Sequence, residues 1–330
     1  MHPLASVVIP CYNCDAYLES TLRSVREQTY PNVELVLVDD GSTDNTRSII
    51  ERHSDDAACH FGPNRGASAA RTTGTELAQG EYVQYLDADD ALRPTALEER
   101  IAALQNADAD VAYSKYQLLV SRNGAFREGP VVEETLEEIH PDPELATLGH
   151  FWLPPAALTY SRRIVDAIGA WSEELPVIQD ARFLQDAAFH GGTFVKVDQV
   201  LAEYRDHDSG SLSTQNRLAF HRDVWVNVRQ IEERWRKRDG RLSEEQRDTL
   251  ARAYDYCARS FFPEDEVLFR QAADRAYRLR PHGRSRKLSR YQTLVRLLGY
   301  SFPSAVRRML DRGLETSRQC KKIAAEFLPV

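Results

Sequence analysis

Three carboxylates follow a short apolar run in the segment EYVQYLDADD, residues 81–90. They are Asp87, Asp89 and Asp90, and the run YVQYL before them has the aromatic and β-branched character of a buried strand. In an open α/β sheet, ligands bind at the carboxyl ends of the strands, where these acids would lie. Carboxylates this close repel one another, so the cluster indicates a bound cation, and hard oxygen ligands suit Mg²⁺ or Mn²⁺. The alternative is a solvated turn that caps a helix before Pro94.

Strand and helix patterns alternate along the chain that must position these acids. SVVIP (6–10) and ELVLVD (34–39) have the apolar composition of buried strands. A helix capped by Asn13 or Asp15 follows the first strand, and a helix over about residues 66–78 precedes the acidic cluster. Strands joined through helices by short turns run parallel with right-handed crossovers. The first part of the chain therefore predicts an α/β half-domain of the nucleotide-binding type.

The composition is that of a globular protein, with 42% hydrophobic and 28% charged residues among 330. No apolar run approaches the roughly 18 residues of a membrane span, and the N-terminus lacks the pattern of a signal peptide. Five cysteines, an odd number in a chain of this size, do not predict a disulfide framework. We therefore expect a cytoplasmic protein.

Charge is distributed unevenly between the two ends of the chain. Residues 270–330 carry 15 Lys and Arg against 4 Asp and Glu, a net charge of +11. The remaining residues carry a net charge of −19, which together gives the overall −8. A change of this size indicates a domain boundary and a separate partner for the basic tail.

Four segments resemble, in order and spacing, the successive signatures of glycosyltransferase family 2, whose members have the GT-A fold. The segments are VVIPCYN (7–13), LVLVDDGSTDNT (35–46), NRGASAAR (64–71) and GEYVQYLDADD (80–90). The likeness extends over about residues 5–213. It implies a GT-A domain over residues 1–213, with a Rossmann-like, mostly parallel central sheet flanked by helices. Residues 214–330 then form a C-terminal helical, basic module.

The resemblance implies a metal-dependent, inverting transfer from a nucleoside-diphosphate sugar, with a UDP-sugar favoured, by an enzyme of the hexosyltransferase type. Two like charges ~4 Å apart repel by roughly 4 kcal/mol even at an effective dielectric near 20, so a diphosphate needs a cation beside these acids. A divalent cation, Mn²⁺ or Mg²⁺, held by Asp89 with help from Asp87 or Asp90 would stabilise the departing nucleoside diphosphate. Which acid contacts the ribose instead stays open.

The resemblance also predicts contacts with the nucleotide. It implies that Pro10, Tyr12 and Asn13 line the base pocket and that Asp40 accepts a hydrogen bond from a ring N–H. Arg71 would reach the base or a phosphate with its forked donors. The alternatives are a turn-and-cap role for Asp40 and core packing for Tyr12.

Two later segments complete the predicted site. Gln179 and Asp180 stand where family members commonly have a Glu-Asp pair whose second residue is the general base, so Asp180 is predicted to take the proton of the acceptor hydroxyl. The alternative is that Asp180 caps its helix. Relatives often end their catalytic domain with an Arg and then a His, which makes Arg205 and His207 candidates for phosphate or metal contact. The alternative is an ordinary polar loop.

Beyond about residue 215, the sequence predicts helices over residues 218–236, 243–260 and 264–279. For the basic tail we expect no nucleic acid partner, because the acidic body would repel a polyanion. Apolar side chains among the basic ones favour an anionic membrane surface bound through residues 284–330, which suits a peripheral position at the inner face of the membrane and a lipid-linked acceptor. The alternative for the tail is a basic face packed on the acidic body. A saccharide that is not lipid-linked is the other possible acceptor.

Two other function classes compete with a glycosyltransferase. A nucleotidyltransferase would need a phosphate loop rich in Gly and Lys near the first strand, and PCYNCDAYL (10–18) is not such a loop. A catalytically silent module that binds nucleotide sugars stays open, because Gln179 departs from the family pattern.

Overall fold

The computed structural model describes residues 2–122, 125–207, 216–262 and 264–280. The chain divides into two compact units, residues 1–216 and 217–330. The boundary predicted at 213/214 lies outside the described residues and stays a prediction. The membrane surface predicted for residues 284–330 also lies outside them.

One mixed sheet organises the N-terminal unit. Its strands, within the described residues, are β1 (Ala5–Cys11), β2 (Val33–Asp39), β3 (Ala57–Phe61), β4 (Tyr82–Tyr85), β5 (Ala91–Leu92), β6 (Val111–Arg122), β7 (Ala125–Val132), β8 (Leu158–Ser161) and β9 (Phe194–Asp206). They follow the order β3-β2-β1-β4-β8-β6-β9-β5, with β7 paired to β6. The four strands from β3 to β4 are all parallel, and for β1, β2 and β4 the alternation with helices predicted this. The predicted α/β class is therefore confirmed.

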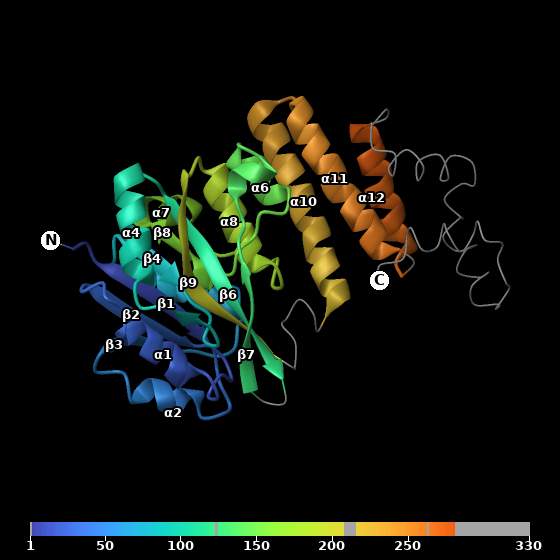
Figure 1. Ribbon diagram of the computed structural model, residues 1–330. Coiled ribbons are helices and arrows are strands. Elements are labelled where there is room, and N and C mark those ends of the chain that lie inside the picture. Colours follow the sequence, from blue (N-terminus) through green and yellow to red (C-terminus); the bar gives the residue numbers. More distant parts are fainter. Residues whose placement is uncertain (1, 123–124, 208–215, 263, 281–330) are drawn as a thin grey trace. The chain divides into compact units, whose positions relative to one another are not determined.

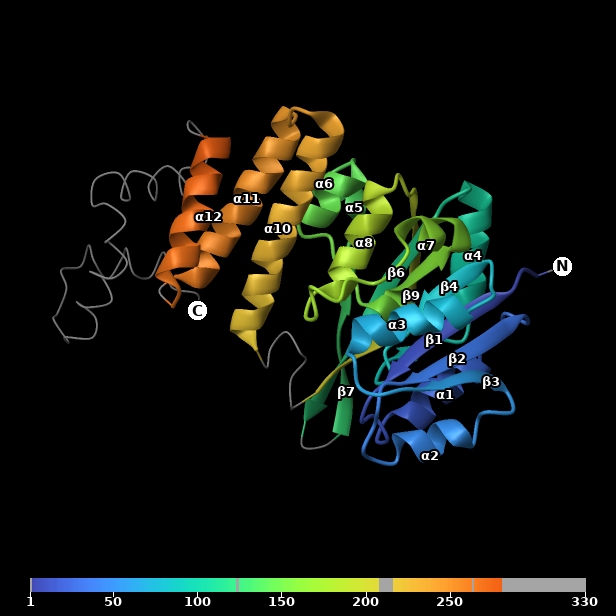
Figure 2. The same ribbon diagram turned by 180° about the vertical axis from the view of Figure 1, so that it is seen from behind.

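Helices cover both faces of this sheet. They are α1 (Leu18–Arg26), α2 (Thr46–Glu51), α3 (Ala67–Leu77), α4 (Ala96–Ala107), α5 (Leu136–Ile139), α6 (Pro143–Leu148), α7 (Arg162–Ile168) and α8 (Gln179–Phe189), with a short 3₁₀ turn, η1 (Pro155–Ala157). Figures 1 and 2 show α1 and α2 on one face and α3 on the other. The strands between them are apolar on both sides, and Val7, Val8 and Ile9 of β1 are completely buried.

The loops after β1 and β2 are tied together by two side chains predicted to cap α1. That prediction is wrong, because α1 begins at Leu18 and no side chain caps it. The Asn13 side-chain oxygen instead accepts a hydrogen bond from the backbone N–H of Thr43, at 2.8 Å. Asp15 accepts from the backbone N–H of Asn45, at 3.3 Å. The ends of β1 and β2 therefore present one joined surface.

Two strands of the sheet have local features that the sequence analysis did not predict. The sequence did not predict β3, whose five residues alternate between half-buried and exposed positions at the sheet edge and lack a continuous apolar run. Strand β9 carries a bulge. Ser114 pairs with Val197 and Lys115 with Val200, so Asp198 and the residue after it bulge out of the ladder. Strands β6 and β7 pair antiparallel.

The C-terminal unit is helical, as predicted. Its described helices are α10 (Arg217–Asp239), α11 (Glu244–Phe261) and α12 (Glu266–Leu279). Ser243 and Gln246 form a reciprocal capping box that starts α11. Large buried side chains fill the space between the helices: Trp225, Trp235, Tyr254, Phe261 and Phe269. No helix in the described part of the chain is long and apolar enough to cross a membrane.

Candidate active site

The loop after β4 is fixed to the end of β9 by two neighbouring acids. Asp90 is completely buried and accepts a hydrogen bond from the backbone N–H of Arg205, at 2.9 Å. The Arg205 guanidinium donates to the backbone carbonyl of Asp89, at 2.6 Å. The Asp89 side chain remains 42% exposed, and its Oδ2 lies 2.9 Å from Nε2 of His207. The structure therefore brings three predicted residues, Asp89, Arg205 and His207, to one place.

Asp87 pairs with a buried cation. Its carboxylate accepts from the guanidinium of Arg71 on α3, whose side chain is 5% exposed and lies over the Trp171 ring, 4.8 Å from its centre. Burial raises the pKa of Asp87, and the charge of Arg71 opposes that rise. Arg71 thus neutralises an acid, and its predicted contact with base or phosphate stays a prediction. Its Nε and Nη1 have no hydrogen-bond partner.

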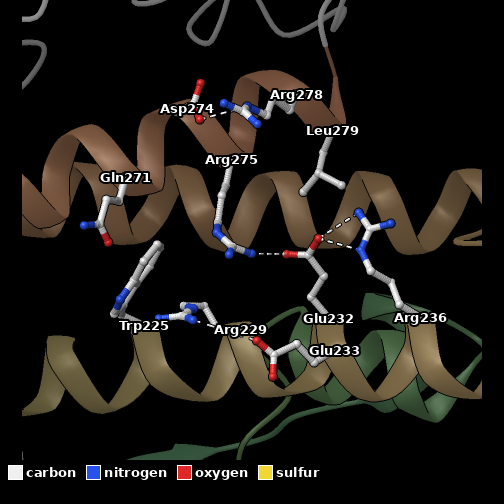
Figure 3. Close-up of a pocket in the computed structure, with 10 residues that line it drawn as sticks. All are labelled: Trp225, Arg229, Glu232, Glu233, Arg236, Gln271, Asp274, Arg275, Arg278 and Leu279. Carbon is white, nitrogen blue, oxygen red and sulfur yellow. Dashed lines mark hydrogen bonds and ion pairs between the residues drawn. The ribbon is translucent and has the colours of Figure 1, made fainter.

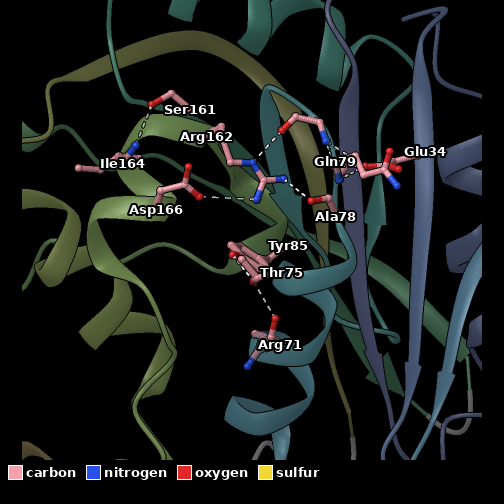
Figure 4. A network of polar contacts seen from close by, with 12 residues as sticks. Glu34, Arg71, Thr75, Ala78, Gln79, Tyr85, Ser161, Arg162, Ile164 and Asp166 are labelled. Carbon is pink, nitrogen blue, oxygen red and sulfur yellow. Dashed lines mark hydrogen bonds and ion pairs between the residues drawn. The ribbon is translucent and has the colours of Figure 1, made fainter.

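A network of hydrogen bonds connects Arg71 on α3 with β4 and with the start of α7 (Figure 4). The Thr75 hydroxyl donates to the backbone carbonyl of Arg71 and meets the Tyr85 hydroxyl, both at 2.7 Å. Arg162 at the start of α7 donates to the carbonyls of Ala78 and Gly80, both at 2.9 Å. Helix α3, strand β4 and helix α7 are therefore joined beneath the acidic loop.

Two of the predicted metal ligands lie together, because Oδ2 of Asp89 is 2.9 Å from Nε2 of His207. Among the described residues, no group of three or more His, Cys, Asp or Glu side chains is arranged to hold a metal ion. Asp87 and Asp90 stay predicted ligands, and each has a different environment in this structure. One is paired with a cation, and the other is turned into the core, where its Oδ2 is buried without a partner.

The predicted base pocket has an exposed aromatic rim. The Tyr12 side chain is 50% exposed, beside the half-buried Pro10 at the end of β1. Asn13 adopts a left-handed backbone conformation, with φ of 48°, and its N–H donates to the Ser42 hydroxyl at 3.1 Å. The three predicted residues therefore sit together on the surface that joins the β1 and β2 loops. Tyr12 is not a core residue.

Asp40 holds a turn. Its two carboxylate oxygens accept hydrogen bonds from the backbone N–H groups of Arg65 and Gly66, each at 2.8 Å. Gly66 has a positive φ of 91° just before α3, a conformation that glycine adopts readily. Asp40 therefore has a turn-and-cap role in this structure, and its predicted contact with a nucleobase stays a prediction.

Asp180 lies in the first turn of α8 and is held at both oxygens. Oδ1 accepts from the backbone N–H of Ala181 at 2.8 Å, and Oδ2 accepts from the indole N–H of Trp152 at 2.9 Å. Its side chain is partly exposed, and burial raises its pKa. The N-cap of α8 is Ile178, so Asp180 is not the cap of its helix.

Two aromatic residues of this site were not predicted as functional. Tyr204 on β9 has its pKa raised first by burial and then by the negative charges of four carboxylates: Asp90, Asp87, Asp89 and Asp180. Acids that are ninety residues apart therefore act on one phenol ring. Trp152 lies near this ring, with centroids 6.5 Å apart. The sequence offered only a weak signal for both, an aromatic residue within a segment of the family resemblance.

A separate cavity of about 620 Å³ lies in the helical unit (Figure 3). Four arginines and three carboxylates line it: Arg229, Arg236, Arg275, Arg278, Glu232, Glu233 and Asp274. The Glu232 carboxylate accepts from Arg275 at 2.8 Å and from Arg236 at 2.9 Å. Arg278 lies 2.8 Å from Asp274. Charge in this cavity is largely balanced by neighbours on the same helices.

Comparison with protein families identifies the N-terminal domain. Residues 6–139 match the family model described as Glycosyl transferase family 2. The chain is therefore similar to this family over residues 6–139. It is 33% identical over 117 residues to an Escherichia coli family relative, UDP-Glc:alpha-D-GlcNAc-diphosphoundecaprenol beta-1,3-glucosyltransferase WfaP, covering 35% of this chain and 47% of WfaP. The chain spans about half the length of the curated relatives it matches, from 41% to 52% for four of them.

Solved structures of glycosyltransferases confirm the GT-A fold. Residues 1–349 of S. aureus TarS superpose with a TM-score of 0.61 at 20% identity, over 84% of this chain and 81% of that one. The mannosyltransferase PcManGT from Pyrobaculum calidifontis gives a TM-score of 0.56 at 17% identity, over 99% and 84% of the two chains. At these identities the likeness concerns the fold alone.

Proposed function

We propose that the chain is an inverting, metal-dependent glycosyltransferase that moves a sugar from a nucleoside-diphosphate sugar to a hydroxyl group. The partly exposed Asp89 carboxylate, whose Oδ2 lies 2.9 Å from Nε2 of His207, supports this proposal most directly. Such a transfer needs a cation beside the leaving diphosphate and a base near the attacking hydroxyl. Asp89 beside His207 would hold the cation, and Asp180 on α8 would be the base.

Asp89 and His207 would hold the divalent cation, Mn²⁺ or Mg²⁺, which when bound neutralises the diphosphate and stabilises it as it departs. Arg205 would contact a phosphate, since its guanidinium already lies against the Asp89 carbonyl. Pro10, Tyr12 and Asn13 would line the base. TarS has been solved with UDP and with UDP-GlcNAc, and PcManGT with GDP-Man and Mn²⁺, which supports a nucleotide-sugar donor with UDP favoured.

Asp180 would act as the general base. In an inverting transfer, the acceptor oxygen attacks the anomeric carbon from the face opposite the leaving diphosphate, and its proton passes to the base. The new C–O bond forms as the bond to the diphosphate oxygen breaks. Asp180 lies on α8, outside the β4 loop that carries Asp89, so it can serve the face away from the cation.

The acceptor is a hydroxyl of a saccharide or of a lipid-linked saccharide. WfaP is named for transfer to GlcNAc-diphosphoundecaprenol, which favours a role in bacterial polysaccharide or glycolipid synthesis. A cytoplasmic site at the inner face of the membrane would suit such an acceptor.

Titration calorimetry with UDP, with and without Mn²⁺, tests the cation site. In the Asp89→Ala variant we expect the Mn²⁺-dependent part of the UDP affinity to be lost, because the variant removes the exposed carboxylate that faces His207. Asp198→Ala, which removes an exposed carboxylate at the β9 bulge, is the matched control and should bind UDP as the native protein does. Retained Mn²⁺-dependent affinity in Asp89→Ala would sink the assignment. Binding of UDP-sugars without any release of UDP would instead favour a silent module.

A further inference from the structure

We propose that Trp152 is a positioning residue that holds the Asp180 carboxylate in the orientation needed to take a proton. The inference deepens the proposed function and rests on it, because it assigns Trp152 a task only if Asp180 is the base. Nothing in the sequence motifs of the site pointed to this tryptophan.

The hydrogen bonds to Asp180 come from two separate parts of the chain. The indole N–H of Trp152 donates to Oδ2 at 2.9 Å, and the backbone N–H of Ala181 donates to Oδ1 at 2.8 Å. An indole N–H can only donate, so this contact favours the ionised, acceptor-only form of the carboxylate. With one donor on each oxygen, the carboxyl plane cannot turn without breaking a bond. Each oxygen keeps a lone pair for an acceptor hydroxyl.

The segment that carries Trp152 is itself anchored. Its neighbours Phe151 and Leu153 are buried in the core, and Phe151 packs edge-on against Tyr113 with centroids 5.1 Å apart. Trp152 between them is only half-buried, and its ring meets Tyr204 edge-on. The indole therefore reaches Asp180 from a fixed backbone, which is what a positioning residue requires.

Trp152→Phe tests the hydrogen bond, because it keeps an aromatic ring and deletes the donor. The chain has four tryptophans, so the ¹⁵N-labelled protein should give four indole N–H signals, and the one missing in Trp152→Phe identifies Trp152. In the Asp180→Ala variant, that signal should move further than the other three. An unmoved signal would overturn the proposal whether or not any activity is found.

A double-mutant cycle measures the functional coupling. The readout is release of UDP from UDP-glucose and UDP-N-acetylglucosamine with Mn²⁺, using water as the acceptor. Trp152→Phe should lower kcat about tenfold with little change in the donor KM, the size expected when a hydrogen bond to a charged group is lost. In an Asp180→Asn background the same change should alter kcat less than twofold. Trp235→Phe, the same substitution in the helical unit, should leave kcat unchanged in both backgrounds.

The possible outcomes separate the two proposals. If Asp180→Asn keeps most of the activity, Asp180 is not the base, and both proposals fall. If Asp180→Asn abolishes turnover while Trp152→Phe leaves kcat unchanged, only the positioning role fails. Equal losses from Trp152→Phe in both backgrounds would mean a general structural effect, which also contradicts the positioning role.

Discussion

Two clusters of buried charge, one in each unit of the molecule, differ in how many partners their charged groups have. In the helical unit, the Glu232 carboxylate is matched by three donors: Arg236, Arg275 and Tyr254. In the N-terminal unit, Asp90 keeps a buried oxygen without a partner, and Arg71 keeps two unpaired nitrogens. Aromatic rings pack against both clusters. The two clusters therefore differ in the number of hydrogen-bond and ion-pair partners of their charged groups.

The pKa values of Asp90 and Glu232 are shifted in opposite directions, because the two carboxylates differ in their number of polar partners. Burial raises the pKa of Asp90 well above its ordinary value, and the charges of Asp89 and Asp87 add to the rise. For Glu232 burial also favours the neutral acid, yet the bonds from Tyr254 and Arg236 outweigh it and hold the pKa below its ordinary value. A matched cluster stabilises the fold. An unmatched one beside an exposed carboxylate is suited to receive a charged ligand.

The largest effect should come from the N-terminal unit. Asp180→Asn should lower turnover of a UDP-sugar by ~10²–10⁴-fold, because a positioned general base contributes that much. UDP affinity measured by calorimetry should stay the same, since Asp180 lies outside the β4 loop. A loss smaller than tenfold would mean that another group is the base.

Breaking the matched cluster should affect stability alone. Glu232→Ala leaves two arginines and a tyrosine without their acceptor, so the free energy of unfolding should fall by about 3–5 kcal/mol. Urea unfolding followed by tryptophan fluorescence measures the change. Glu233→Ala, whose carboxylate is exposed and lies 3.8 Å from Arg229, is the matched control and should lose less than about 0.5 kcal/mol. A change in UDP affinity in Glu232→Ala would contradict the separation of the two clusters.

The pH dependence of turnover should reflect the raised pKa of Asp180. The base must be ionised, so kcat should fall as the pH drops through that pKa, by about tenfold per pH unit below it. Because burial raises the value, this acid limb should lie above the ordinary 3.8 of an aspartate. Steady-state rates from pH 3 to 8 provide the test. A limb at or below the ordinary value, or one retained in Asp180→Asn, would assign it to another group.

The smallest effect should come from the ring that packs on the cation site. Phe126 on β7 lies 5.5 Å from the His207 ring and 5.8 Å from the Arg205 guanidinium. Each such contact contributes about 0.5–1.5 kcal/mol, so Phe126→Ala should weaken Mn²⁺-dependent UDP binding by roughly 2–10-fold. Val131→Ala, an exposed position on the same strand, should leave the affinity unchanged. Equal affinities for both variants would show that the ring does not support His207.

Local patterns in the sequence were enough to predict the parallel strands β1, β2 and β4 and the acid at the end of β4. Asp89 stays near solvent next to a strand end, although its contacts with Arg205 and His207 could not be predicted locally. The partners of Asp40, Arg71 and Asp90 could not be predicted in this way. Asp40 is held by backbone N–H groups 25 and 26 residues away, and Asp90 by one 115 residues away. The partners of these side chains depend on burial and on which segments of the chain meet in three dimensions. The residues next to a carboxylate in the sequence do not reveal either.

The hydrogen bond from Arg205 to Asp90 also bears on how the protein is made. Strands β1, β2, β3 and β4 and their helices lie within the first 85 residues and can pair as soon as that stretch leaves the ribosome. Strand β5 must wait for its antiparallel partner, since Ala91 pairs with Glu203. Pairing of two strands so far apart in the sequence is slow, because the chain between them loses conformational entropy before the contacts between the strands form. The acidic loop after β4 is therefore completed late, after the N-terminal part of the sheet. A nascent chain that ends before β9 contains the residues proposed to contact the nucleobase but lacks the residues at the end of β9 that are proposed for the cation site.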